Sequence, residues 1–425
     1  MTALLARGRT IITRLRLPLA IQLTGLTVGA AGFQGMTALM TAKWLGASER
    51  GVIAIAQTLS MVLLLVGCAG LTTGTRVVLA DDSRRIDFRS YVRATRWLLL
   101  SQLILVTTVG LSVFIRLTHI SVAAVAISFI IIGVGSLRAA LLREAFHGVG
   151  WHRAAVFSEL LAAVVPLFLV IAAHYRGVLS LSVAMLSLAA GYITQLILQS
   201  LFARRYLAQS RTETVTNRAG LALLRYILRF CLPGFVATLG FAFAGRMDRL
   251  VLAYFHNTAA VGVYSTASTL ADAAWIIPMA SSALIVRQVA QTKSPQAHRL
   301  WWRRILLMTV AMSLVIFVAS AWLLTHFLGP EFASGIPVVA VLLVGALALA
   351  SQQVDLAVCS GMGDLGASAH VALAGVLVAA VLFFSLIPPF GAMGCALASA
   401  ATYFVTAAVA RLRLRKHLSV ELGAA

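Results

Sequence analysis

Charged residues are scarce in this 425-residue chain. Asp, Glu, Lys and Arg together make up 11% of the residues, whereas 60% are hydrophobic. A soluble domain averages about 25% charged residues. The chain has too few polar side chains to cover its surface in water, which excludes a soluble enzyme and indicates that lipid covers most of it.

Cysteines and acidic residues are also few. Cys68, Cys231, Cys359 and Cys395 stand alone inside apolar runs, with no CxxC pair and no nearby histidine cluster, so the sequence predicts no disulfide framework, no metal site and no cofactor. Only 13 acidic residues oppose 34 basic ones, a formal net charge of +21. The basic residues lie in short stretches between apolar runs and form no basic domain, which argues against nucleic-acid binding.

Long apolar runs fill most of the sequence. A membrane-crossing helix needs about 20 mostly apolar residues, and windows of that length predict twelve crossings, at residues 18–40, 52–75, 97–117, 120–142, 153–174, 179–202, 222–253, 260–286, 305–328, 333–359, 368–389 and 391–411. We therefore expect an N-terminal tail (1–17), a six-helix lobe (18–203), a linker (204–221), a second six-helix lobe (222–411) and a C-terminal tail (412–425).

The basic residues predict the orientation. Of the 34 Lys and Arg residues, 28 lie in the two tails and the even-numbered connections, whereas only Lys43, Arg50, Arg116 and Arg176 fall on the other side. Cytoplasmic connections of membrane proteins carry the excess of Lys and Arg. This distribution predicts a multi-pass protein of the bacterial cytoplasmic membrane with both termini in the cytoplasm.

The two halves of the sequence repeat. Gly51-Val52 and Ala56-x-Thr58-Leu59 return 211 residues later as Gly262-Val263 and Ala267-x-Thr269-Leu270, and Gly148-x-Gly150 returns as Gly361-x-Gly363. Six predicted helices, an even number, separate the copies, so both halves have the same orientation. The repeat predicts two parallel six-helix halves around a central cavity, with a substrate path between them.

Three stretches resemble a known family. They are Leu232-Pro233 … Arg246-x-Asp248 … Gly262-Val263-Tyr264-Ser265, the connection Leu328-Gly329-Pro330-Glu331-Phe332, and Gly361-Met362-Gly363. Together with length and helix number, they resemble the polysaccharide (O-antigen and teichoic-acid type, Wzx-like) flippases of the multidrug/oligosaccharidyl-lipid/polysaccharide, MATE-like, exporter superfamily. The resemblance implies that a polyprenyl-diphosphate-linked glycan is moved from the inner to the outer leaflet. It also implies membrane lipid and the glycosyltransferases and polymerase of the same pathway as partners.

Three alternatives stay open. A cation-coupled drug antiporter of the same superfamily is expected to carry a carboxylate in the first helices, but the first predicted helix contains Gln22, Gln34 and Thr37 and no carboxylate. A major-facilitator transporter has a glycine-bearing signature after its second helix, and residues 77–85 approach it without either glycine. A membrane-embedded enzyme would need clustered catalytic groups, whereas the nine histidines are scattered.

Ionisable residues inside the predicted helices are the candidate transport residues, because a charge in the bilayer needs a partner or a wet cavity. Arg246 and Arg249 share a helix face. We expect them to bind the diphosphate in the cavity, with snorkelling to the interface as the alternative. Asp248 lies on another face and is expected to pair with a neighbouring helix.

The next helix carries a polar stripe at i, i+3, i+4 and i+7, formed by Ser265, Ser268, Thr269 and Asp272. It is expected to line the cavity, with Asp272 as a possible site for a coupling proton or cation. Gln34 is a further expected cavity residue. Glu159 and Asp355 are acidic candidates for coupling, or for pairing with Arg138 or other basic residues near the cytoplasmic side.

Overall fold

The computed structural model describes residues 19–80, 86–209, 220–292, 298–364 and 366–423, and within them all regular secondary structure is helical. The first half contains α2 (Leu19–Cys68), α3 (Leu71–Ala80), α4 (Phe88–Ala94), α5 (Arg96–Leu105), α6 (Leu111–Thr118), α7 (Ala123–Gly148), α8 (His152–Tyr175) and α9 (Leu181–Gln209). The second half contains α10 (Gly220–Phe255), α11 (Thr258–Asp272), α12 (Ile276–Thr292), α13 (His298–Trp322), α14 (Gly335–Gly361) and α15 (Gly366–Gly423). We call these halves the N-lobe and the C-lobe.

Two of the helices reverse direction at a glycine. Helix α2 has 50 residues, about 75 Å at 1.5 Å per residue and more than twice the roughly 30 Å of a bilayer core. It breaks at Gly46, where φ is 82°, and α15 breaks in the same way at Gly391, where φ is 54°. Both φ values lie in the left-handed region that glycine adopts without steric cost. Each of these two helices therefore supplies two predicted crossings.

The number of crossings agrees with the prediction. Within the described residues, nine helical stretches are long and apolar enough to span a membrane. The reversals in α2 and α15 raise the number to eleven, and α10 corresponds to the remaining predicted crossing at 222–253. The predicted all-α polytopic fold with two lobes is confirmed.

Several predicted boundaries differ from the structure. The third crossing begins earlier, because α4, α5, a π-helical turn at Val106–Gly110 and α6 run together from Phe88 to Thr118. The predicted tail at 412–425 continues α15 as far as Gly423, and residues 204–209 of the predicted linker belong to α9. The predicted tail 1–17 and linker residues 210–219 lie outside the described residues.

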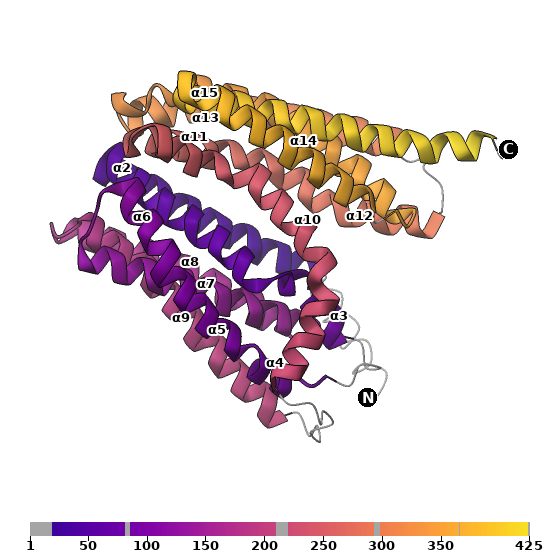
Figure 1. Ribbon diagram of the computed structural model, residues 1–425. Coiled ribbons are helices and arrows are strands. Elements are labelled where there is room, and N and C mark those ends of the chain that lie inside the picture. The colour runs from indigo at the N-terminus through magenta and orange to yellow at the C-terminus, as the bar shows by residue number, and fades with distance from the viewer. Residues whose placement is uncertain (1–18, 81–85, 210–219, 293–297, 365, 424–425) are drawn as a thin grey trace, which may run out of the picture.

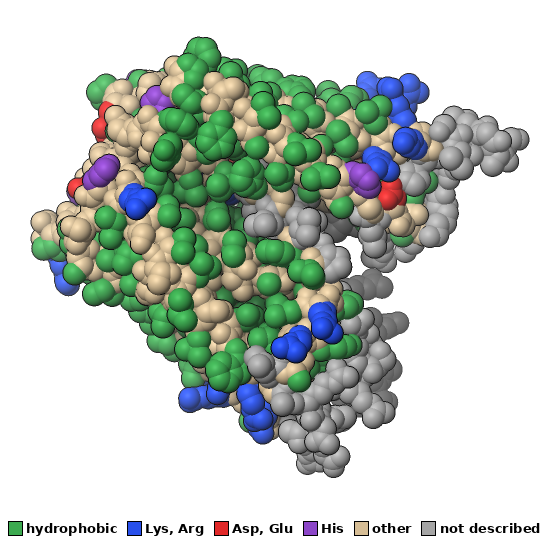
Figure 2. Space-filling model, viewed as in Figure 1, with side chains coloured by type: hydrophobic (Ala, Val, Ile, Leu, Met, Phe, Trp, Pro, Cys, Tyr) green, Lys and Arg blue, Asp and Glu red, His purple; other side chains and the backbone are tan. Residues whose placement is uncertain are grey.

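The two lobes meet at one end and separate toward the other (Figure 1). Helix α10 crosses between them, and its first turns pack in the N-lobe: Leu223, Ile227 and Cys231 share a buried cluster with Leu71 and Leu141. Apolar side chains cover the helix flanks, and many of the Lys and Arg side chains in view lie at the ends where the lobes separate (Figure 2). Exposed residues such as Phe168 and Val318, at 62% and 69%, suit contact with lipid tails.

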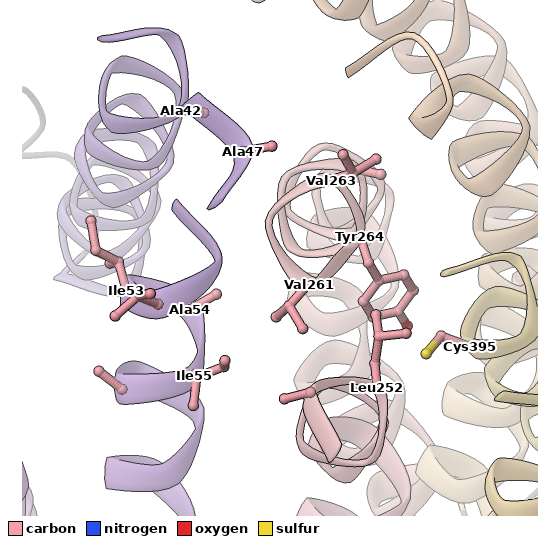
Figure 3. Close-up of a cluster of buried hydrophobic side chains, with 14 of the residues drawn as sticks. Ala42, Ala47, Ile53, Ala54, Ile55, Leu252, Val261, Val263, Tyr264 and Cys395 are labelled. Carbon is pink, nitrogen blue, oxygen red and sulfur yellow. The ribbon is translucent and has the colours of Figure 1, made fainter. Parts of the chain in front are cut away.

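The end where the lobes meet, which we call the closed end, is built on two glycines. A methyl group at Gly51 would lie 1.8 Å from the carbonyl oxygen of Thr258, and one at Gly262 would lie 1.8 Å from that of Ala47. The Ser48 and Thr258 hydroxyls are 2.8 Å apart. Figure 3 shows the apolar layer beside this contact, with α2 facing α11. Only glycine permits so close an approach of the two helix backbones.

Candidate functional site

A cavity of about 950 Å³ lies between the lobes. Residues of α2, α7, α8 and α9 form its N-lobe wall, and residues of α10 and α11 form its C-lobe wall. Its polar lining includes most of the predicted cavity residues and several others: Gln34, Thr37, Thr41, Arg50, Gln57, Thr58, Ser60, Ser136, Arg143, Glu159, Tyr192, Gln195, Arg246, Arg249, Thr269 and Asp272. Four arginines and two carboxylates stand among them, so the charge of the lining is positive.

Arg246 and Arg249 both face this cavity. They lie three residues apart on α10, which places them on one helix face. Arg246 Nη1 is 3.5 Å from Asp272 Oδ2, and Arg249 Nη2 donates a hydrogen bond to Ser268 Oγ at 2.7 Å. The Nε of Arg249 is buried and has no hydrogen-bond partner among the described residues. Arg249 therefore lines the cavity with a guanidinium group that is only partly hydrogen-bonded within the described residues.

Arg50 is a cavity residue that the sequence analysis missed. It follows the reversal of α2, is 3% exposed, and has a buried Nε without a hydrogen-bond partner in the described part of the chain. Arg50 and Arg249 line the same cavity from opposite lobes. Sequence reasoning assigned Arg50 to a connection because it stands near the end of an apolar run, where arginines usually report topology. Its position directly before the repeated Gly51 was the available signal.

Glu159 lines the cavity toward the end where the lobes separate. Its Oε1 accepts a hydrogen bond from Arg143 Nη1 at 3.1 Å, and Arg143 Nε also lies 3.4 Å from Glu144 Oε1. Glu159 thus contacts Arg143, one of the other basic residues that the prediction allowed beside Arg138. Arg138 does not line the cavity.

The predicted stripe on α11 is divided between two environments. Thr269 and Asp272 line the cavity, whereas Ser265 and Ser268 are buried inside the C-lobe. The Ser265 hydroxyl donates to the Gly262 carbonyl of its own helix at 3.1 Å. The Ser268 hydroxyl accepts the hydrogen bond from Arg249 Nη2. The prediction that all four residues line the cavity is corrected. The i, i+3, i+4, i+7 pattern places the four side chains on one helix face, but it does not show how much of that face the cavity reaches.

Asp248 lies inside the C-lobe, away from the cavity. It is 5% exposed, accepts a short hydrogen bond from the Tyr264 hydroxyl, and lies 3.5 Å from Ser399 Oγ. These contacts join α10 to α11 and α15. Two residues along a helix turn the side chain by about 200°, which directs Asp248 away from the face of Arg246.

Asp355 is also remote from the cavity. It is fully buried between His298 Nε2 and Arg411 Nε, each at 2.8 Å. Arg411 Nη2 continues the network to Ser351 Oγ at 3.2 Å. Asp355 therefore joins α13, α14 and α15 at the far end of the C-lobe. Within the described residues, no group of three or more His, Cys, Asp or Glu side chains is placed to hold a metal ion.

The fold and the cavity define a two-lobed polytopic membrane protein with a basic central cavity. No protein-family model and no curated protein matches the chain. Among solved structures, it is similar to an inward-facing multidrug resistance MATE family transporter of the MOP superfamily, with a TM-score of 0.70 at 15% identity over 92% of this chain and 95% of that one. It is also similar to lipid II flippase MurJ in an inward closed conformation, with a TM-score of 0.70 at 12% identity over 93% of this chain and 87% of that one.

An outward-facing MATE family transporter of the MOP superfamily is also similar, with a TM-score of 0.54 at 16% identity over 96% of this chain and 100% of that one. The chain thus has the fold of these solved MATE family and MurJ structures, as the sequence resemblance led us to expect.

Proposed function

We propose that this protein is a flippase that carries a polyprenyl-diphosphate-linked glycan from the inner to the outer leaflet. The observation that carries the proposal is the excess of arginines in the cavity lining, which includes the buried Arg50 and the half-buried Arg249 from opposite lobes. The Nε atoms of these two residues are buried and lack hydrogen-bond partners among the described residues. Buried donors without partners are costly, and guanidinium groups bind phosphate bidentately. A diphosphate in the cavity supplies the negative charge that its lining lacks.

The separated end of the lobes is assigned to the cytoplasm. Most basic residues belong to the tails and connections of that side, as the positive-inside rule requires. The similarity to the inward-facing MATE transporter, with a TM-score of 0.70, exceeds that to the outward-facing one, at 0.54, which supports an inward-facing arrangement of the lobes. Transport then proceeds by alternating access: the lobes rock, the closed end opens, and the lipid tail stays in the bilayer.

The membrane potential supplies a driving force without a nucleotide site. An anion moving outward across an inside-negative potential gains about 2.3 kcal/mol per charge per 100 mV. The two charges of a diphosphate would therefore supply about 4–5 kcal/mol at 100 mV. This is enough to bias the direction of export.

The drug antiporter is the less favoured alternative. A cationic drug needs an accessible carboxylate, but the two carboxylates of the cavity lining contact arginines: Asp272 contacts Arg246 at 3.5 Å and Glu159 contacts Arg143 at 3.1 Å. The similarity to lipid II flippase MurJ supports a lipid-linked substrate. The Wzx-like resemblance adds the polysaccharide unit.

The test is deletion of the gene in its own host, followed by analysis of lipid-linked intermediates and surface glycan. A flippase mutant accumulates polyprenyl-linked units on the cytoplasmic side and loses surface polymer, and the wild-type gene restores both. Normal surface glycan combined with increased drug sensitivity would instead identify an antiporter.

A further inference from the structure

A second cavity lies at the closed end, on the side of the molecule and apart from the central one. Its volume is about 620 Å³, and it shares no lining residue with the central cavity. One wall comes from the N-lobe and the other from the C-lobe: Val113, Arg116, Leu117, Thr118 and His119 at the end of α6, and Ala253, Tyr254, His256, Asn257 and Thr258 at the end of α10 and the start of α11. We call this cavity the lateral groove.

The charge of the lateral groove favours an anion. Arg116, His119 and His256 are its titratable basic residues, and its lining contains no carboxylate. The His256 Nε2 donates to the Ile387 carbonyl at 3.0 Å, which fixes the ring beside the groove. Arg116 is also one of only four basic residues on the side that otherwise lacks them. A phosphate group would explain why a positive charge is placed here.

The surroundings favour a ligand with an apolar tail. The groove lies where two apolar helices end, and the residues near its rim are exposed and hydrophobic: Tyr254 is 72% exposed, and Phe255 and Ile115 are also exposed. The rings of Tyr254 and Phe255 pack edge to face, with centroids 5.0 Å apart. Tyrosine is enriched at the level of lipid headgroups. Figure 2 shows mostly hydrophobic and uncharged side chains along α6, with a Lys or Arg side chain near its end.

We propose that the lateral groove binds the phosphate of an anionic glycerophospholipid headgroup of the outer leaflet. A bilayer phospholipid is favoured over departing substrate because the groove has no lining residue in common with the central cavity and is closed off from it by the Gly51 and Gly262 contact. Since its walls come from different lobes, a bound headgroup bridges them and stabilises the closed end. The assignment of the lateral groove to the outer leaflet rests on the proposed function.

The test is lipid binding to the purified full chain, measured by native mass spectrometry with phosphatidylglycerol, phosphatidylcholine, undecaprenyl diphosphate and inorganic phosphate as separate probes. Wild type should retain phosphatidylglycerol in preference to phosphatidylcholine. The variant Arg116→Ala should weaken this binding about fivefold, the effect of one basic residue at an anionic lipid surface, and Arg116→Ala with His119→Ala should weaken it further. Arg176→Ala, an exposed arginine on the same predicted side, is the matched control and should bind like wild type.

Three results would overturn the inference: equal binding by the Arg116→Ala, His119→Ala variant and wild type, equal loss in the Arg176 control, or binding of undecaprenyl diphosphate or free phosphate but not phosphatidylglycerol. Binding in detergent depends on neither transport nor orientation. Labelling of an Asn257→Cys variant with a membrane-impermeant thiol reagent in intact cells reads the orientation separately. A failed flippase assay with intact groove binding would therefore leave this inference standing.

Discussion

The glycine contact at the closed end yields a quantitative prediction. A methyl group at Gly51 or Gly262 would lie 1.8 Å from a backbone oxygen of the other lobe, whereas ordinary contact begins at 3.4 Å. The two backbones must therefore separate by about 1.6 Å, the difference between those distances. The two oxygens belong to the backbone and cannot move aside as the end of a flexible side chain could. The clash is therefore relieved at the lowest free-energy cost by opening the closed end. Overpacking of this kind costs about 1–3 kcal/mol, which shifts a two-state equilibrium about 5–150-fold toward the outward-open state.

Spin labels on the two lobes measure this shift. Tyr175 and Tyr254 are 82% and 72% exposed and end helices of opposite lobes on the closed side. The four native cysteines are buried, so cysteines introduced at the two tyrosine positions are labelled selectively. In the Gly51→Ala or Gly262→Ala background, the distance distribution should shift to longer values. Gly25→Ala is the control, since nothing lies within 4 Å of a methyl group there. We call the contact of Gly51 and Gly262 with the opposite lobe the gate. Unchanged distances in correctly folded glycine variants would refute the inference that the gate is the contact that opens.

Three further predictions concern the cavity, the C-lobe network and the topology. Arg249→Ala should reduce export ten- to a hundredfold, since hydrogen bonds to charged groups contribute about 1.5–3 kcal/mol. Arg249→Lys should retain part of the export activity. Equal export by both variants, at equal expression, would show that Arg249 has no role in substrate binding. Asp355→Ala should lower stability by about 3–5 kcal/mol because it leaves buried basic partners uncompensated, read as a reduced melting temperature in detergent, whereas Arg415→Ala at an exposed position should not. A reporter fused near Asn257 should report the outside; a cytoplasmic signal there would contradict two six-helix lobes.

The helices could be predicted from the sequence because membrane insertion makes strong local demands. Every crossing needs about 20 apolar residues, and every backbone polar group must be satisfied within its own helix. Each segment must meet these demands by itself, so its own sequence shows the apolar pattern whatever its neighbours are. Gly46 lies between the first two predicted crossings, and Gly391 is the first residue of the predicted crossing 391–411. At both positions φ is in the left-handed region, which suits glycine.

The cavity was only partly predictable because a helix pattern fixes relative directions and not neighbours. The three-residue spacing placed Arg246 and Arg249 on one face, and both line the cavity. The same type of argument failed for Ser265, which is buried against its own helix. Arg50 was missed because its burial depends on how the lobes meet at Gly51 and Gly262, which no local pattern shows.

The repeat separates the moving parts from the binding parts. At the offset of 211 residues, Gly51 corresponds to Gly262 and Ala47 corresponds to Thr258. The two gate contacts, Gly51 on Thr258 and Gly262 on Ala47, are therefore images of each other. Under the proposed alternating access, a symmetric gate would let the two similar lobes rock about a shared contact without favouring either. The duplication thus accounts for the scaffold and the gate.

The charges break this symmetry. At the same offset, Arg246 and Arg249 correspond to Gly35 and Ala38, and Arg50 corresponds to Val261. An anion held by all three arginines would contact the N-lobe through Arg50, which lies beside the gate, and the C-lobe through Arg246 and Arg249. Opening the gate must separate Arg50 from Arg249, because they belong to opposite lobes. Under the proposed function, the motion that exposes the site to the outside therefore also weakens its hold on the diphosphate, so that release follows from opening itself.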